Sequence, residues 1–195
     1  MQKLSVKDLI NVGIYTAVYF LVIFMIAMMG FVPILLIVGV AIEAVFGTIV
    51  YMVYLTKVEK FGMLTITGIL LGCISFVSGR PIATLFISIA AGVLADLAWK
   101  KGNYKSVFWG IVSACCMFLW IAGFELPMFF QYRDNYMESL RGSYGDAYVD
   151  TLLSLTPNWM FFGMIGLGII GSIIGGVLGK RILTKHFEKL FLAEE

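Results

Sequence analysis

Three charged side chains interrupt apolar stretches of the sequence, and these are the residues best suited to bind a ligand. Glu43 lies in GVAIEAVFG, Glu125 in IAGFELPMFF, and Arg80 between two apolar runs in SFVSGRPIATLF. A carboxylate within a bilayer costs at least about 2.5–3.5 kcal/mol, so both glutamates should face protein or water. Each glutamate can contact a ligand, pair with Arg80, or be a protonated or hydrogen-bonded structural residue.

Arg80 has two interpretations that its sequence context leaves open. Its planar guanidinium can clamp an anion, because it binds carboxylate or phosphate through two parallel hydrogen bonds. Alternatively, Arg80 extends to lipid headgroups, while Pro81 occupies the favoured first position of the next helix.

The sequence lacks the residue patterns of common catalytic and metal sites. The single histidine, His186, lies in TKHFEKLF near the C-terminal end, and no HExxH, GxSxG or P-loop pattern occurs. Cys73, Cys115 and Cys116 lie in apolar runs without CxxC spacing. We therefore expect no catalytic residue and no metal site, and we keep an intramembrane enzyme that uses Glu43 and Glu125 on a lipid as an alternative.

The composition requires a membrane as the solvent of the fold. Hydrophobic residues make up 61% and charged residues 13% of the 195 positions, whereas soluble domains have about 45–50% and about 25%. The net charge of +2 is too small to indicate nucleic-acid binding. The first apolar segment is longer than the core of a signal peptide, so we expect it to be a membrane span.

The hydropathy pattern predicts an all-α membrane protein with six transmembrane helices in a single domain, residues 1–195. A span needs about 20 apolar residues, and turn residues such as Gly30, Gly62 and Gly79 separate the runs. A long connection, predicted to be an outer loop, covers 133–157, and it is either a lid over a site or a solvated loop. The expected spans are 9–29, 31–55, 61–79, 81–99, 107–132 and 158–184.

The lysines and arginines predict the orientation of these spans. Eleven of the fourteen fall on one side of the expected bundle, and the other three are Arg80, Arg133 and Arg141. The positive-inside rule then places both termini in the cytoplasm and Arg80 at the outer mouth. The outer ends of the spans are rich in methionine and aromatic residues, which suit an adaptable apolar pocket. From these residues we select Met28, Met29, Met128, Tyr132 and Trp159 as candidate ligand-binding residues, together with Arg80, Glu43 and Glu125.

Small residues at a spacing of four predict close helix contacts. Gly171, Gly175 and Gly179 form one face of the last span, which we expect to pack within the monomer. Gly13 and Ala17 in GIYTA form a similar face that is a candidate for docking an external partner. Asp96 is expected to pair with Lys100, four residues further along the same helix.

Several segments in order resemble the substrate-binding S components of energy-coupling factor (ECF) transporters, and most closely the bacterial Trep_Strep family. These segments are KLSVKDLINVGIYTAVYF, MGFVPIL, KVEKFGMLTITGILLG, SGRP, GVLADL and GGVLGKRILTKHFEK. The resemblance covers most of the chain and is weakest over 133–157.

This resemblance implies an S-component-like helical bundle in the plasma membrane that captures a micronutrient from outside. Such a subunit docks on a transmembrane coupling subunit and two ATP-binding subunits, which carry the ATP hydrolysis, so the chain itself is not expected to be an enzyme. The small pair Gly13 and Ala17 corresponds to the docking surface, where the family often has two alanines.

The ligand is left open between two kinds of cofactor. A metal ion is not expected, because the pocket region lacks histidine and clustered carboxylates. Aromatic walls, methionine sulfur and Arg80 favour a flat apolar ligand that bears carboxylates, such as haem, with methionine or tyrosine as an axial ligand. A vitamin or vitamin precursor is the main competitor, and a ligand-free membrane subunit is the remaining alternative.

Overall fold

The computed structural model of the protein describes residues 3–130 and 132–191, with side chains as far as residue 184. His186, Lys185 and Lys189 therefore lie outside the described side chains. The described part is helical and contains no strand. Its elements are α1 (Val6–Ala27), the 3-10 turn η1 (Met28–Phe31), α2 (Pro33–Leu55), α3 (Met63–Val77), α4 (Ile82–Lys101), α5 (Val107–Phe118), α6 (Trp120–Phe129), α7 (Arg133–Tyr144), α8 (Asp146–Leu155) and α9 (Met160–Phe191).

The structure supports five of the six predicted spans directly. Among the described residues, five helical segments are long and apolar enough to cross a membrane, with α5 and α6 counted together. The segment predicted as a span over 61–79 contains α3, which has 15 residues and so rises about 22 Å, less than the hydrocarbon thickness of about 30 Å. α3 starts after Gly62 and stops before Gly79, both with positive φ. The sixth span stays a prediction.

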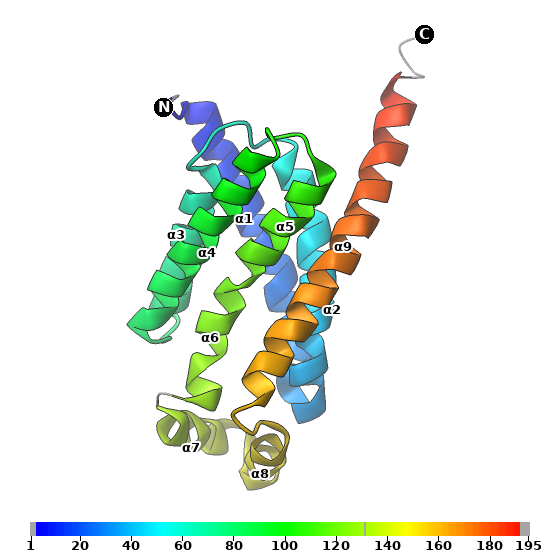
Figure 1. The fold of residues 1–195 in the computed structure, drawn as a ribbon. Coiled ribbons are helices and arrows are strands. Elements are labelled where there is room, and N and C mark those ends of the chain that lie inside the picture. Colours follow the sequence, from blue (N-terminus) through cyan, green and yellow to red (C-terminus); the bar gives the residue numbers. More distant parts are fainter. Residues whose placement is uncertain (1–2, 131, 192–195) are drawn as a thin grey trace.

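The start of α1 and the end of α9 lie at the same end of the bundle, opposite α7 and α8 (Figure 1). Within the described residues, the lysines gather at the first of these ends, where Lys60 bridges to Asp8 at 2.7 Å and fastens the α2–α3 connection to α1. Arg80, Arg133 and Arg141 belong to the opposite end. This arrangement agrees with the charge distribution used to predict orientation, and the cytoplasmic location of both termini stays a prediction.

Glycines bring α9 into direct backbone contact with α2, as the sequence predicted for the last span. A Cβ atom at Gly171 would lie 2.5 Å from the carbonyl oxygen of Ala41, and one at Gly175 would collide with the carbonyl oxygen of Val45. Gly179 similarly faces Met52. Because the lipid supplies no hydrophobic driving force between helices, such close van der Waals packing is what holds these helices together.

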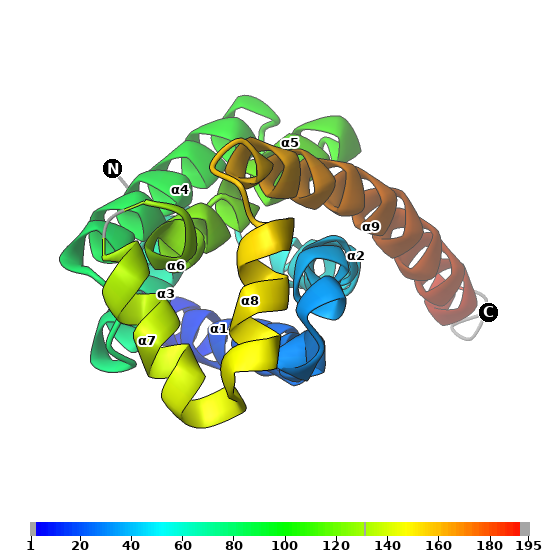
Figure 2. The ribbon, with the colours of Figure 1, turned by 90° about the horizontal axis from the view of Figure 1, so that it is seen from below.

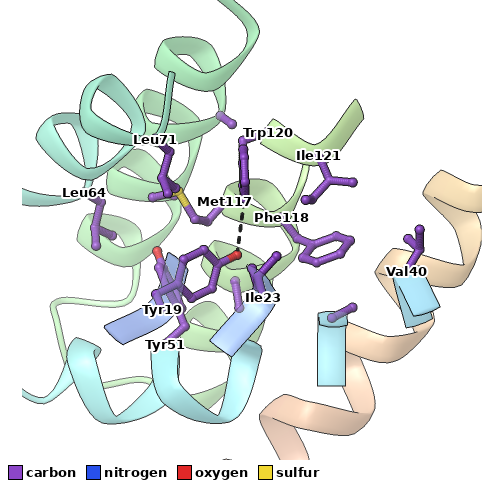
Figure 3. Close-up of a cluster of buried hydrophobic side chains, with 14 of the residues drawn as sticks. Tyr19, Ile23, Val40, Tyr51, Leu64, Leu71, Met117, Phe118, Trp120 and Ile121 are labelled. Atoms are coloured by element: carbon purple, nitrogen blue, oxygen red, sulfur yellow. Dashed lines mark hydrogen bonds between the residues drawn. The ribbon is translucent and has the colours of Figure 1, made fainter. Parts of the chain in front are cut away.

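The centre of the bundle is apolar, and several hydroxyl groups buried in it are hydrogen-bonded. Figure 3 shows Tyr19 and Trp120 among buried aliphatic side chains, with Trp120 Nε1 donating to Tyr19 Oη at 3.4 Å. Tyr51 Oη lies 2.9 Å from Ser113 Oγ, which donates to the carbonyl of Ala95. Buried polar groups are costly unless they are hydrogen-bonded, and these pairings meet that requirement.

The expected pairing of Asp96 with Lys100 is wrong. Asp96 is fully buried, and its Oδ2 accepts bonds from the backbone N–H groups of Gly62 and Thr65 and from the Thr65 hydroxyl, at 2.6–3.0 Å. Lys100 instead lies 5.6 Å from the ring centre of Phe61. The first N–H groups of α3 have no partner within their own helix, so a carboxylate from α4 caps them in preference to an exposed ion pair.

The segment 133–157, predicted to be a long outer loop that is either a lid or a solvated connection, is mostly helical. It forms the short helices α7 and α8, joined at Gly145, whose φ of +83° favours glycine. Seen from below, the two helices lie across the end of the bundle (Figure 2).

The α2–α9 contact predicts that Gly175→Ala destabilises the protein by about 1–3 kcal/mol, the usual cost of overpacking. The added methyl would collide with the Val45 carbonyl oxygen and lie 3.0 Å from Thr48 Cβ. Thermal unfolding of the purified protein in detergent measures the effect.

Gly166→Ala is the matched control on the same helix, because a Cβ there meets no atom within 4 Å. Equal unfolding midpoints for the two variants would contradict the proposed α2–α9 packing.

Candidate functional site

A proline in α6 creates the junction on which the candidate site is built. Pro127 lies inside α6 and has no N–H, so the carbonyl of Gly123 four residues earlier loses its helical donor. Thr84 of α4 replaces it, with its hydroxyl donating to Gly123 O at 2.8 Å in a buried setting. A Cβ at Gly123 would lie 3.1 Å from Thr84 Cα, so glycine permits this approach. The start of α4 is thereby fixed against α6.

Arg80 lies just before α4, and the junction brings it over the aromatic residues of α6 and α7. Its guanidinium carbon is 3.8 Å from the ring centre of Phe124 and 5.2 Å from that of Tyr136. Cation–π contacts of this kind contribute about 0.5–2 kcal/mol, depending on desolvation. Arg80 is partly buried, and its guanidinium lies against side chains of α6 and α7. This position favours the ligand-facing interpretation over a side chain that extends to lipid headgroups.

One face of α7 supplies further aromatic residues to the same region. Tyr136, Leu140 and Tyr144 are four residues apart, so they project from the same side of the helix, and all three line the cavity described below. Tyr148 of α8 stacks on Tyr144 with ring centres 4.8 Å apart. Burial raises the pKa of Tyr136, although Arg80 opposes the shift, so this phenol is neutral at physiological pH.

The α7–α8 hairpin is bonded to the bundle near its turn, and its start is bonded to the segment that follows α8. Tyr148 Oη donates to the carbonyl of Gly30 at 2.7 Å. Arg133 donates to Thr156 O at 2.8 Å and to Asn158 Oδ1 at 2.7 Å. Val149 and Leu152 of α8 are fully buried. The hairpin therefore covers the end of the bundle as an ordered structure (Figure 2).

A cavity of about 390 Å³ lies beneath this cover. Its volume falls within the range of about 300–1,000 Å³ that is usual for small-molecule sites. Apolar and aromatic side chains form most of the wall, and the ionisable groups in it come from four helices and the turn before α4. The lining residues are Phe24, Ile26, Ala27, Met28, Gly30, Phe31, Leu35, Leu36, Val40, Glu43, Arg80, Phe124, Glu125, Tyr136, Leu140, Tyr144 and Tyr148.

Glu43 and Glu125 face this cavity from α2 and α6. Glu43 is 7% exposed and Glu125 is partly buried. The salt bridges found among the described residues join other groups, so neither carboxylate is within 4.0 Å of a described cationic group, Arg80 included. In the same part of the chain, no cluster of three or more histidine, cysteine, aspartate or glutamate residues is arranged to hold a metal ion.

The structure brings together four of the eight residues selected from the sequence. Arg80, Glu43, Glu125 and Met28 line the cavity. Met128 is fully buried elsewhere, whereas Met29, Tyr132 and Trp159 are exposed, Trp159 by 66%. These four do not line the cavity, and their role in ligand binding stays a prediction.

Sequence reasoning missed the three tyrosines of α7 and α8, as well as Phe124. The spacing of Tyr136, Leu140 and Tyr144 was a usable signal, because residues at i, i+4 and i+8 share one face of a helix. In a segment that is predicted to be a loop, such spacing does not indicate which side chains share a face.

Gly13 and Ala17, the candidate docking residues, lie on the outer surface of α1. Ala17 is exposed, and a Cβ at Gly13 would meet no atom within 4 Å. Ile10 and Ile14 beside them are each 55% exposed. Neither small residue is needed for packing inside the monomer, so this face is free to contact lipid or another protein.

The contact between Tyr148 and Gly30 predicts that Tyr148→Phe loosens the α7–α8 hairpin. Loss of one hydrogen bond costs about 0.5–1.5 kcal/mol, which is about a twofold to twelvefold increase in local opening. Amide hydrogen exchange of 146–155, measured by mass spectrometry, should be faster by that factor.

Tyr144→Phe serves as the control, because the Tyr144 hydroxyl makes no hydrogen bond to the described residues while its ring makes the same kind of stacking contact. Unchanged exchange in Tyr148→Phe would mean that this bond does not hold the hairpin.

Comparison with known proteins gives the chain a family. A family model described as "hypothetical bacterial integral membrane protein (Trep_Strep)" matches residues 6–189, which is nearly the whole length and includes every residue that lines the cavity. No curated protein and no solved structure matches the sequence. The helical fold, the apolar spans and this match together show that the chain belongs to the Trep_Strep family of bacterial integral membrane proteins.

Proposed function

We propose that this protein is the substrate-capturing subunit of an ECF-type importer, which takes up a micronutrient from the outer side of the plasma membrane. The observation that carries the proposal is the cavity of about 390 Å³ beneath the α7–α8 hairpin, with Arg80, Glu43 and Glu125 in its wall. Apolar walls with a few polar anchors are the general form of a small-molecule site.

The charge distribution supports an outward-facing cavity. The end of the bundle that carries α7 and α8 has Arg80, Arg133 and Arg141, whereas the described lysines belong to the opposite end. By the positive-inside rule, the cavity end then faces outward, and both termini face the cytoplasm. A site with this orientation suits capture from the medium.

The arrangement of the charged groups favours capture over the two alternative classes. An intramembrane enzyme would use Glu43 and Glu125 on a lipid, whereas the cavity that they face lies beneath the α7–α8 hairpin and has the volume of a small-molecule site. A ligand-free structural subunit would not need a cavity of about 390 Å³ with two carboxyls and a guanidinium in its wall. Binding a small molecule explains both features.

Energy for transport would come from partners: a transmembrane coupling subunit and two ATP-binding subunits. The exposed small residues of α1 support this part of the proposal, since small side chains let another helix approach closely. The cargo would be a cofactor-sized organic molecule, such as a vitamin, a vitamin precursor or haem.

Capture in the cavity predicts that the purified protein carries a stoichiometric small molecule, and that Ala27→Trp removes it. Ala27 lines the cavity, so an indole there fills part of the volume. Mass spectrometry of an extract of protein purified in mild detergent detects the molecule.

Ala90→Trp is the matched control, because Ala90 is exposed on α4 away from the cavity. If no small molecule is found in the unsubstituted protein, even after growth in rich medium, the capture function is wrong. Equal amounts of bound molecule in the Ala27→Trp and Ala90→Trp variants would mean that the molecule binds outside this cavity.

Docking through α1 predicts that the double substitution Gly13→Leu and Ala17→Leu abolishes uptake and leaves capture intact. Two leucines would hold a partner helix away, whereas the open space at Gly13 leaves the monomer fold unaffected. The readouts are cellular accumulation of the molecule identified in the extract, and its occupancy in the purified variant.

Ala90→Leu, on a different exposed helix face, is expected to transport normally. Normal uptake by the α1 double variant would rule out this face as the docking surface without affecting the assignment of the cavity.

A further inference from the structure

Glu43 has no hydrogen-bond or ion-pair partner among the described residues, and its carboxyl group faces the cavity. It lies in the middle of α2, is 7% exposed, and makes no hydrogen bond or ion pair with any described residue. Val40, three residues earlier, also lines the cavity, so this face of α2 is turned toward it. The Glu43 oxygens are not among the buried atoms that lack a partner, so they are open to the cavity. The cavity is the direction from which a donor can come.

The cavity contains more acidic than basic groups. Glu125 faces it from α6, and Arg80 is the cationic residue in its described lining. Arg80 already contacts the rings of Phe124 and Tyr136 and forms no ion pair with either glutamate. Two carboxyls therefore face one guanidinium, so the wall is better suited to a ligand with positive charge than to a dicarboxylate.

Aromatic rings in the wall favour the same kind of ligand. Phe24, Phe31, Tyr144 and Tyr148 also line the cavity, and Phe31 and Tyr144 pack together with ring centres 5.9 Å apart. Aromatic faces attract cations and stack against flat rings. A cavity with both carboxyl groups and aromatic rings in its wall can bind a cationic nitrogen attached to an apolar body.

We propose that the cavity takes a flat ring compound that carries a protonated or quaternary nitrogen, with Glu43 and Glu125 as the groups that bind the charge. This inference rests on the proposed capture function and names the class of molecule captured. It makes haem a poorer candidate than an amine-bearing vitamin or precursor, because the two carboxylates of haem would meet Glu43 and Glu125. Arg80 then binds a secondary anionic group or positions Phe124 and Tyr136.

Three indole derivatives of nearly equal size test the charge preference directly. Tryptamine is cationic, tryptophol is its neutral analogue, and indole-3-acetate is anionic. We measure their affinities for the purified protein at pH 7 by isothermal titration calorimetry, after removing any bound molecule. Tryptamine is expected to bind about tenfold or more tightly than indole-3-acetate, with tryptophol between them, as one partly desolvated ion pair would give.

The glutamate variants identify the responsible groups. Glu43→Gln and Glu125→Gln keep the side-chain shape and are each expected to weaken tryptamine about tenfold while leaving tryptophol nearly unchanged. Glu138→Gln is the control, because Glu138 is exposed on α7 and does not line the cavity. Should a glutamine variant fail to fold, the order of the three indoles in the unsubstituted protein still decides the question.

Each other outcome overturns the inference. Indole-3-acetate binding as tightly as tryptamine, no binding of any indole, or a tryptamine affinity that both glutamine variants leave unchanged would each contradict it. The proposed function is judged separately: a neutral or anionic molecule in the extract would leave capture standing and defeat the cationic class. An extract without any bound molecule would defeat both.

Discussion

The carbonyl oxygen of Gly123 needs a donor that its own helix does not provide, and this requirement organises the candidate site. In a membrane interior no water is available to satisfy a free backbone group. Pro127 removes the usual N–H, and the Thr84 hydroxyl supplies the bond at 2.8 Å. Because Thr84 lies four residues after Arg80, the same contact that repairs α6 also holds the start of α4 in place.

That junction positions two of the three charged residues that line the cavity. Arg80 lies over Phe124, one residue after Gly123, and Glu125 follows immediately. α7 and α8 then close the end of the bundle, with Tyr136 against Arg80 and Tyr148 bonded to Gly30. Glu43 reaches the same space from α2, which is held by its glycine-mediated contact with α9. The site thus depends on the contact between α4 and α6, the contact between α2 and α9, and the α7–α8 hairpin that Tyr148 bonds to Gly30.

The sequence was sufficient to predict the membrane class, most of the helices and half of the selected cavity residues. Long apolar runs and glycine turns identify spans because the bilayer imposes a length and a composition. Glu43, Arg80 and Glu125 were recognisable because a charge in an apolar segment needs an explanation. The stacked glycines of α9 likewise pack inside the monomer, as their spacing predicted.

Other features depend on tertiary contacts that no local pattern contains. Asp96 caps α3 from a different helix, so its i+4 neighbour Lys100 was a misleading partner. Met128 and Trp159 have the right residue types for a pocket, but tertiary packing buries Met128 of α6 in the interior and leaves Trp159, in the turn before α9, exposed. The helices α7 and α8 were missed because polar residues and Gly145 hid a spacing-of-four pattern in the tyrosines.

The central claim is that the cavity beneath α7 and α8 is a binding site, and an experimental structure of the protein purified from cells grown in rich medium tests it most directly. The account predicts non-protein density between Glu43, Arg80 and Glu125, in contact with the aromatic rings of α7 and α8. A well-resolved map in which side chains or ordered water fill that space would contradict it.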